Sequence, residues 1–196
     1  GRGQLWLVAG AAARQRAADL PELLLEAEEY GWWYSAPQPD GTLLVALMTD
    51  SDLPPARGRS GLADRWSTAL DRTTHTRARA AGATLVGAIR LVRADSGFLR
   101  PDRGRGWRAV GDAARAHDPL AGRGVARALQ SAIGAAAEID RELAGEEPLR
   151  AEPAAAFGDY LDQRGRYYVE EDRWGAALFW ARRRPPAWRR AALILE

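Results

Sequence analysis

One segment of the sequence, from Trp107 to Leu143, constrains the fold most strongly. Its apolar stretch Trp107–Val110 predicts a short strand that ends at Gly111 and Asp112, and a loop rich in Gly and Pro follows. Beyond the loop, apolar residues recur at helical spacing and predict a long helix. These residues are Val125, Leu129, Ala132, Ile133, Ala136, Ile139 and Leu143. Such a strand–loop–helix joint indicates an α/β fold with a ligand site between the strand end and the helix N-terminus.

The loop of this joint suits a flat ligand that carries hydroxyl groups. Gly122 and Gly124 have no Cβ, so a ligand can approach the backbone closely there. The carboxylate of Asp112 repels phosphate, but it can accept hydrogen bonds from ligand hydroxyls. Asp118 is expected to cap the turn before Pro119. In the alternative interpretation, the segment is an ordinary connection without a ligand.

The residues before this joint predict an antiparallel sheet and a short helix. Residues 23–49 predict two or three antiparallel strands with a turn at Asp40–Gly41, and residues 84–92 predict a further strand. The apolar run Leu43–Met48 requires cover on both faces, and without it the strand would promote aggregation. Leu62, Trp66, Ala69 and Leu70 have helical spacing, so a short helix is expected there.

The C-terminal part of the chain predicts a single long helix and a basic tail. The helix is expected to begin near Pro153, which suits a first-turn position, and to end at Pro185–Pro186. It carries the aromatic residues Phe157, Tyr160, Tyr167, Tyr168, Trp174 and Phe179, and the last four are expected to pack against the sheet. The arginines at 182–184 and 189–190 are interpreted as a solvated tail.

Composition excludes several classes of protein. The chain has 28 Arg and no Lys against 26 acidic residues, and a net charge of +2 is small for a nucleic-acid-binding protein. With no Cys and only His75 and His117, a thiolate or multi-histidine metal site is not expected. His75 is expected at the surface or at a helix cap, and His117 in a structural hydrogen bond. No apolar run approaches the roughly 20 residues of a membrane span, and we expect a cytoplasmic protein.

The joint itself resembles a known motif. Gly111-Asp112-Ala113-Ala114, then Asp118-Pro119-Leu120 and Gly122-Arg123-Gly124 before an apolar helix, resembles the second FAD-binding motif of the flavoprotein monooxygenases. This family includes aromatic hydroxylases, geranylgeranyl reductases and flavin-dependent halogenases. The resemblance implies FAD as the cofactor, held through its ribityl chain by Asp112 and covered on one side of its ring by Pro119. The backbone that would face the pyrimidine edge and stabilise the reduced flavin is that of Gly122, Arg123, Gly124 and Val125.

A second segment is similar to the halogenase branch of this family. Gly31-Trp32-Trp33-Tyr34-Ser35-Ala36-Pro37 resembles the halogenase motif Gly-Trp-x-Trp-x-Ile-Pro, with Tyr34 in place of the second Trp and Ala36 in place of the Ile. Arg115 follows the two alanines where aromatic hydroxylases have His. The resemblance makes Trp32, Trp33, Tyr34 and Pro37 candidates for the substrate pocket. Core packing is the alternative for each aromatic residue, and Trp33 should face away from Trp32 and Tyr34.

The resemblance covers the chain from about Leu23 to Arg184. The Gly-x-Gly-x-x-Gly strand–turn–helix that holds the FAD pyrophosphate is not found, because the matching pattern at Gly104–Ala109 precedes a strand and is interpreted as loop. We therefore interpret the chain as the C-terminal portion of an FAD-dependent oxidoreductase. Four regions are expected. They are a remnant of the FAD-domain connection (1–22), an antiparallel substrate-binding sheet region (23–94), the second FAD motif and its helix (95–145), and a C-terminal helix with a basic tail (146–196).

In the complete enzyme, the resemblance implies that reduced FAD reacts with oxygen to give a hydroperoxide. This species would hydroxylate an electron-rich organic substrate, or oxidise halide where the family's Lys is present. The electrons would come from a separate flavin reductase or from NAD(P)H. The substrate would lie between the flavin and the sheet region, and no catalytic side chain is assigned.

Two other functions remain open from the sequence. In one, the chain is a truncated, non-catalytic module that binds a partner or nothing. In the other, it is part of a flavoprotein maturation enzyme that modifies side chains of another protein, so the substrate is a protein in place of a small molecule.

Overall fold

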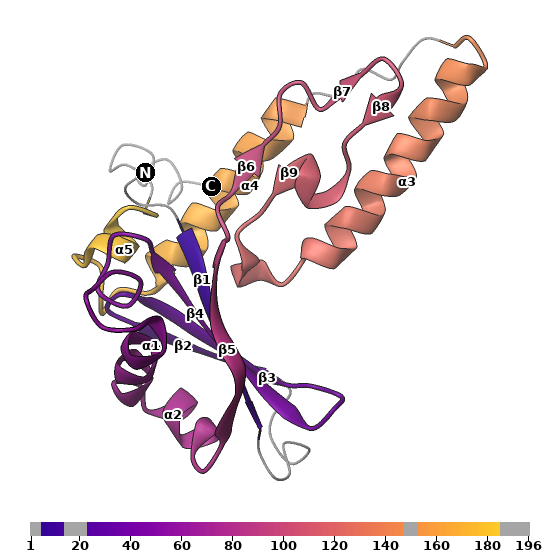
Figure 1. Ribbon diagram of the computed structural model, residues 1–196. Helices are drawn as coiled ribbons and strands as arrows, with labels where there is room; N and C mark the ends of the chain where they lie inside the picture. The colour runs from indigo at the N-terminus through magenta and orange to yellow at the C-terminus, as the bar shows by residue number, and fades with distance from the viewer. Residues whose placement is uncertain (1–4, 14–22, 147–152, 185–196) are drawn as a thin grey trace. The chain divides into compact units, whose positions relative to one another are not determined.

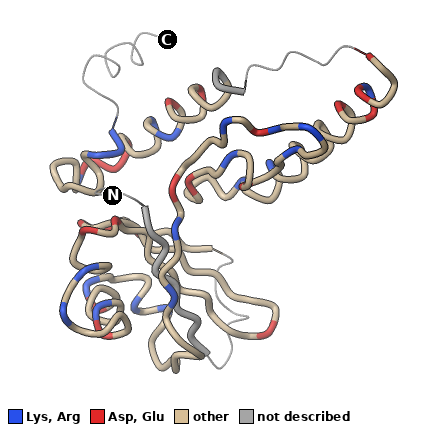
Figure 2. Tube along the Cα trace, turned by 45° about the horizontal axis from the view of Figure 1, so that its top comes forward, with Lys and Arg blue, Asp and Glu red and all other residues tan. Residues whose placement is uncertain are grey.

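The computed structural model describes residues 5–13, 23–146 and 153–184, and the side chains of 23–146 and 156–184. It confirms the predicted mixed α/β class and divides into two compact units (Figure 1). Unit 1 comprises residues 1–93 and 165–196, and unit 2 comprises Ala94–Arg164. Basic and acidic residues are interspersed along the chain, in keeping with its small net charge (Figure 2).

Unit 1 is built on a five-stranded antiparallel sheet with the order β2-β3-β4-β1-β5. Its strands are β1 (Leu5–Ala13), β2 (Leu24–Glu28), β3 (Gly31–Pro37), β4 (Thr42–Asp50) and β5 (Thr84–Arg93). The meander over residues 23–49 and the strand over 84–92 are therefore confirmed. The Asp40 side chain accepts hydrogen bonds from the backbone N–H and the hydroxyl of Thr42, which closes the predicted β3–β4 turn.

The first strand is a finding that the sequence does not predict. Residues 1–22 are expected to be a connection, but Leu5–Ala13 pair along their whole length with β4 and along most of it with β5. An Ala-rich strand has weak intrinsic preference for a sheet, and its two partner strands decide its conformation.

Helix α1 (Leu62–Asp71) confirms the predicted short helix, and it covers one face of the sheet. Trp33 packs edge-on against Trp66 at 5.6 Å between ring centroids, among Leu43, Val45 and Leu47. These three apolar residues of β4 are fully buried, so the cover that the apolar run requires lies within this chain. Glu26 accepts hydrogen bonds from the first backbone N–H groups of the adjoining helix α2 (His75–Ala80), which places the exposed His75 at a helix start, as expected.

Trp32 takes part in a different buried cluster of unit 1. Its indole N–H donates to the Tyr168 hydroxyl at 3.1 Å, and Tyr168 contacts Phe179 and Trp180. The Trp180 indole donates to the backbone oxygen of Glu28 at 2.8 Å, which anchors the C-terminal residues on strand β2. The expected packing of Tyr168 and Phe179 is confirmed, whereas Tyr167 is 43% exposed.

The single C-terminal helix expected from the sequence is wrong. Helix α4 runs over Pro153–Glu170, and a separate short helix, α5, spans Leu178–Ala181. Between them the chain turns, with Gly175 N–H bonded to the Asp172 carbonyl and Ala177 N–H to the Trp174 carbonyl. The turn lets the aromatic residues of α5 pack beside Tyr168, which a continuous helix could not do.

The solvated tail is also a wrong prediction for Arg182 and Arg183. Asp50, at the end of β4, is fully buried and forms ion pairs with Arg182 at 2.9 Å and with Arg183 at 2.5 Å. Arg182 also pairs with Asp52, and the Arg183 guanidinium lies 3.7 Å from the centroid of the Phe179 ring. The arginines at 189–190 lie outside the described residues.

Unit 2 contains the strand–loop–helix joint. Two short antiparallel strand pairs are present: β6 (Gly97–Phe98) pairs with β9 (Arg115–Ala116), and β7 (Arg103–Gly104) forms a hairpin with β8 (Trp107–Arg108). The expected strand therefore spans only Trp107–Arg108, and the pattern at Gly104–Ala109 belongs to a tight hairpin and not to a loop. The turns η2 (Gly111–Ala113) and η3 (Pro119–Ala121) lead into the long helix α3 (Gly124–Leu143), which is confirmed.

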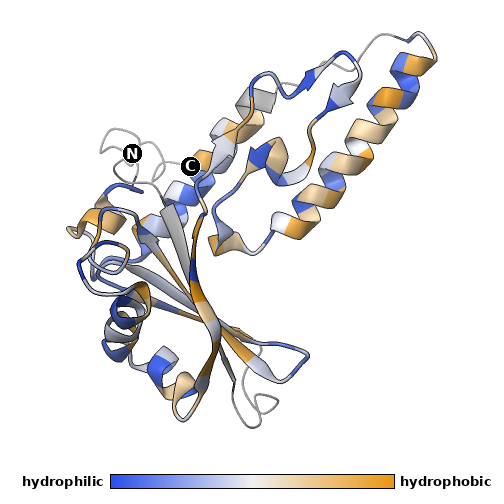
Figure 3. Ribbon diagram, in the orientation of Figure 1, coloured by the Kyte–Doolittle hydropathy of each residue, from blue (hydrophilic) through white to orange (hydrophobic). Residues whose placement is uncertain are grey.

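Helix α3 carries an exposed apolar face. Hydrophobic residues recur along the helix (Figure 3), and Val125, Leu129, Ile133 and Leu143 are between 62% and 83% exposed. Its polar side forms ion pairs instead, where Glu138 binds Arg103 and Arg108 of the β7–β8 hairpin. In unit 2, the large apolar residues of the helix thus lie outside the described core.

Candidate functional site

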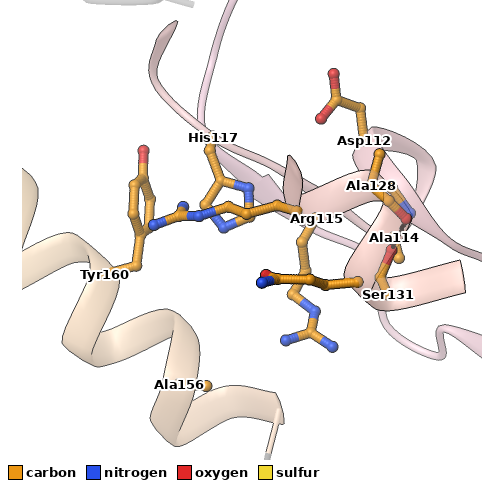
Figure 4. A pocket seen from close by; sticks show the side chains of 11 residues that line it. Asp112, Ala114, Arg115, His117, Ala128, Ser131, Ala156 and Tyr160 are labelled. Carbon is orange, nitrogen blue, oxygen red and sulfur yellow. Dashed lines mark hydrogen bonds between the residues drawn. The ribbon is translucent and has the colours of Figure 1, made fainter. Parts of the chain in front are cut away.

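The predicted ligand joint opens onto a pocket of about 390 Å³ in unit 2. Residues of η2, β9, α3 and α4 line it, and Figure 4 shows Tyr160 and Ala156 of α4 on one side and Asp112 and Ser131 on another. Its chemistry is carried by six residues. They are Asp112, Arg115, His117, Arg127, Ser131 and Tyr160.

Gly111 fixes the geometry of the turn at the pocket wall. Its φ of 57° lies in the left-handed region that favours glycine, and a Cβ there would meet the Ala128 Cβ at 3.2 Å. Its backbone N–H donates to the Ser131 hydroxyl of α3 at 2.8 Å. The next residue, Asp112, is exposed at the pocket, where its carboxylate can accept hydrogen bonds from a ligand.

The loop that follows is held by Asp118. Its side chain accepts from the Leu120 N–H at 3.0 Å and caps the turn that starts at Pro119, which confirms the predicted capping role. Its own backbone N–H donates to the Tyr160 hydroxyl at 2.6 Å. Gly122 then ends the turn with a φ of 61° and leads into α3.

The start of α3 is open. No atom lies within 4 Å of the place that a Cβ would take on Gly122 or Gly124. Arg123 and Val125 are exposed as well. A flat group can therefore reach this backbone, although these residues and Pro119 do not line the pocket that contains Asp112.

Tyr160 organises the centre of the pocket. Its ring contacts His117 edge-on at 4.5 Å, and its hydroxyl also lies 2.6 Å from the Ser96 hydroxyl. The Arg127 guanidinium lies 5.1 Å from the centroid of the same ring. The sequence places Tyr160 on the C-terminal helix, but it indicates no role in the site for Tyr160 or Arg127.

Burial lowers the pKa of His117, and the positive charge of Arg127 lowers it further. A backbone hydrogen bond at Arg115 and the negative charge of Asp112 oppose this shift. The net effect is a pKa of His117 below that of a free histidine.

The four candidates for the substrate pocket lie apart from this site in the chain. Trp32, Trp33, Tyr34 and Pro37 belong to β3 in unit 1. Trp32 is 2% exposed and Trp33 is fully buried, and they join different clusters, which confirms that they face opposite ways. Tyr34 and Pro37 are partly exposed.

Comparisons with known proteins were made over the whole chain. No protein-family profile matches it. LodB of Marinomonas mediterranea, assigned as an FAD-dependent oxidoreductase, is 29% identical over 165 residues, which is 81% of this chain and 43% of LodB. The flavin-dependent halogenase CmlS has the same fold over 94% of this chain and 36% of its own, with a TM-score of 0.80 and 24% identity.

A further solved structure is the peptidyl tryptophan dihydroxylase QhpG, which takes part in the biogenesis of a tryptophylquinone cofactor. It is 25% identical with a TM-score of 0.68, over 93% of this chain and 44% of its own. The chain thus spans less than half the length of these relatives. These similarities agree with the resemblance seen in the sequence: the chain is similar in sequence to part of LodB, and it shares its fold with parts of CmlS and QhpG.

Proposed function

We propose that this chain supplies the part of an FAD site that surrounds the ribityl chain and the flavin ring in an FAD-dependent oxidoreductase. The observation that carries this proposal is the left-handed turn at Gly111, which presents Asp112 at a pocket of unit 2 that α3 also lines. LodB, which is assigned as FAD-dependent, supports the choice of cofactor.

Each residue has a role that fits its surroundings. The exposed carboxylate of Asp112 accepts hydrogen bonds from ribityl hydroxyls. Pro119 lies against the flavin ring, and the N–H groups that open α3 from Gly122 to Val125 donate to electron-rich atoms of its edge. FAD, when bound, supplies the redox chemistry with oxygen, and the protein binds and orients it.

The proposed substrate is an electron-rich organic group, which the enzyme hydroxylates or halogenates. A second candidate is the modification of a side chain in another protein. QhpG favours this candidate, because its name describes it as acting on a peptidyl tryptophan, and it matches nearly the whole of this chain.

The test is a titration of FAD fluorescence with the 196-residue chain and its Asp112→Ala variant. Loss of a hydrogen bond to a charged group costs about 1.5–3 kcal/mol, so Asp112→Ala should weaken binding by about tenfold or more. Asp140→Ala, which removes an exposed carboxylate from α3, serves as the matched control and should bind as the unchanged chain does.

Saturable quenching that weakens only in Asp112→Ala would support the proposal. A folded chain that does not quench FAD, or that binds equally well in Asp112→Ala, would contradict it and favour the non-catalytic module.

A further inference from the structure

The pocket at Asp112 contains more positive charge than a site for a neutral ligand requires. Arg115 and Arg127 both line it, together with His117. A guanidinium stays protonated at any physiological pH, so both charges are permanent. Asp112 is the one carboxylate among the lining residues, which leaves a positive charge uncompensated.

Neither arginine forms an ion pair with any residue in the described parts of the chain. The Arg127 guanidinium lies over the face of the Tyr160 ring, and the Arg115 guanidinium lies 6.0 Å from the centroid of Phe98. Both are partly buried, so their charges lose part of their hydration without gaining a carboxylate.

Two other partly buried arginines of the same unit, Arg103 and Arg108, form ion pairs with carboxylates. A second hollow, of about 600 Å³, is lined by Arg103 and Arg108. There, Glu138 binds both guanidinium groups, and Glu142 binds Arg108 as well. Carboxylates of the protein compensate the charges of that hollow. In the Asp112 pocket the remaining positive charge has no such partner, so an anionic ligand could compensate it.

We propose that the pocket binds an oxyanion, a phosphate or a carboxylate, between the guanidinium groups of Arg115 and Arg127. Guanidinium groups bind both anions through paired N–H donors, and two of them at one pocket suit a doubly charged group. The face of the Tyr160 ring stabilises the Arg127 guanidinium through a cation–π contact. This inference goes beyond the proposed function, because it requires no bound flavin.

The position of Asp112 restricts the rest of the ligand. In Figure 4, Asp112 and Tyr160 lie on different sides of the pocket, and His117 lies between them. The carboxylate of Asp112 repels the anionic group and accepts hydroxyl donors. The ligand therefore carries hydroxyls toward Asp112 and its anionic group toward the arginines. The anion is either a phosphate of the cofactor or an acidic group of the substrate.

The two histidines of the chain allow a direct test, since His117 lies in the pocket and His75 lies in unit 1. Inorganic phosphate is titrated at constant ionic strength into the 196-residue chain with ¹⁵N-labelled histidine. The ring signals of His117 should shift saturably and its pKa should rise, because the anion offsets the charges that lower it. The signals of His75 should not move.

Arginine variants identify the ligands of the anion. Arg115→Gln and Arg127→Gln should each weaken phosphate binding by tenfold or more, and the double variant should lose the shift. Arg105→Gln, which removes an exposed arginine from the β7–β8 hairpin, should bind phosphate as the unchanged chain does. No saturable shift at His117, an equal shift at His75, or a shift that persists in the double variant would overturn the proposal.

A second titration distinguishes the two sources of the anion. If FAD competes with phosphate and riboflavin does not, the cofactor supplies the oxyanion. If neither competes while phosphate still binds, the oxyanion belongs to another ligand. Both results support the anion site. The second result would show that the anion site exists even if the FAD proposal is wrong.

Discussion

At the scale of single residues, the loop from Gly111 to Gly122 is shaped by a few polar contacts. Gly111 takes a left-handed conformation and bonds to Ser131, and Asp118 caps the turn at Pro119. His117 lies against the Tyr160 ring, and burial and the charge of Arg127 lower its pKa. The state of this imidazole has a consequence for stability.

Stability should fall in acid partly because of His117. Its pKa is lowered in the folded state, so the unfolded chain takes up a proton at a higher pH than the folded chain does. The stabilisation is therefore present above the ordinary histidine pKa and is lost as the pH falls below it. His117→Asn should reduce the pH dependence of the unfolding free energy between about pH 7 and pH 5.

The measurement is denaturant unfolding of both proteins at several pH values. His75→Asn is the control, because His75 is exposed at the start of α2. Equal slopes for the unchanged chain and His117→Asn would contradict the assignment.

The sequence predicts these local features well and the distant ones poorly. Asp118, Pro119 and Gly122 are neighbours, so their turn chemistry can be identified from local spacing. Tyr160 comes from α4, and its hydroxyl reaches the backbone of Asp118 across 42 positions of sequence. Arg127 looks like any arginine of an Arg-rich chain, although its place three positions after Gly124 puts it in the first turn of the helix.

At the scale of elements, α5 is fixed to the end of β4 by charge as well as by aromatic packing. Asp50 is fully buried, and its two arginine partners are almost adjacent to α5 in sequence. This role cannot be predicted in a chain so rich in arginine, because nothing in the sequence distinguishes Arg183 from a solvated residue. The burial of Asp50 and the contact with Phe179 make that distinction.

Removing Arg183 should therefore destabilise the chain strongly. Breaking a buried ion pair leaves an uncompensated charge and costs about 3–5 kcal/mol, with Arg182 limiting the loss here through its own bond to Asp50. Arg183→Ala should lower the unfolding free energy, measured in denaturant, toward the low end of that range. Arg173→Ala, which removes a 66% exposed guanidinium that pairs with Glu171, should change it by no more than about 1 kcal/mol. A comparable loss in both variants would show that the buried pair has no special role.

At the scale of the whole molecule, exposed apolar residues are concentrated on α3, whereas the apolar run of β4 is buried. The sequence predicts the apolar stripe of α3, but it does not predict whether the stripe is buried or exposed. Periodicity identifies an apolar face and not the surface that packs against it. Continuous exposed apolar residues favour association and the binding of hydrophobic dyes.

Leu129→Lys combined with Ile133→Lys should reduce dye fluorescence and self-association of the isolated chain. These residues are 62% and 72% exposed, so the folded structure loses little packing when they change. Asp140→Lys makes the same change in net charge at an exposed position of the same helix and should leave both signals as they are. Light scattering and dye titration measure the effect. An equal reduction in Asp140→Lys would assign it to charge instead of the apolar face.

Unit 1 is formed by two separate stretches of the chain, so synthesis fixes the order in which its parts become available. Strand β1 pairs with β4 and β5. Both of its edges can therefore be hydrogen-bonded only after synthesis has reached residue 93. Residues 94–164 then form a separate unit, and only afterwards do Tyr168, Trp180 and Arg183 complete unit 1. Until that point, Asp50 and Trp32 lack the partners that they have in the folded protein. The buried contacts of unit 1 can therefore be completed only after the whole of unit 2 has been synthesised.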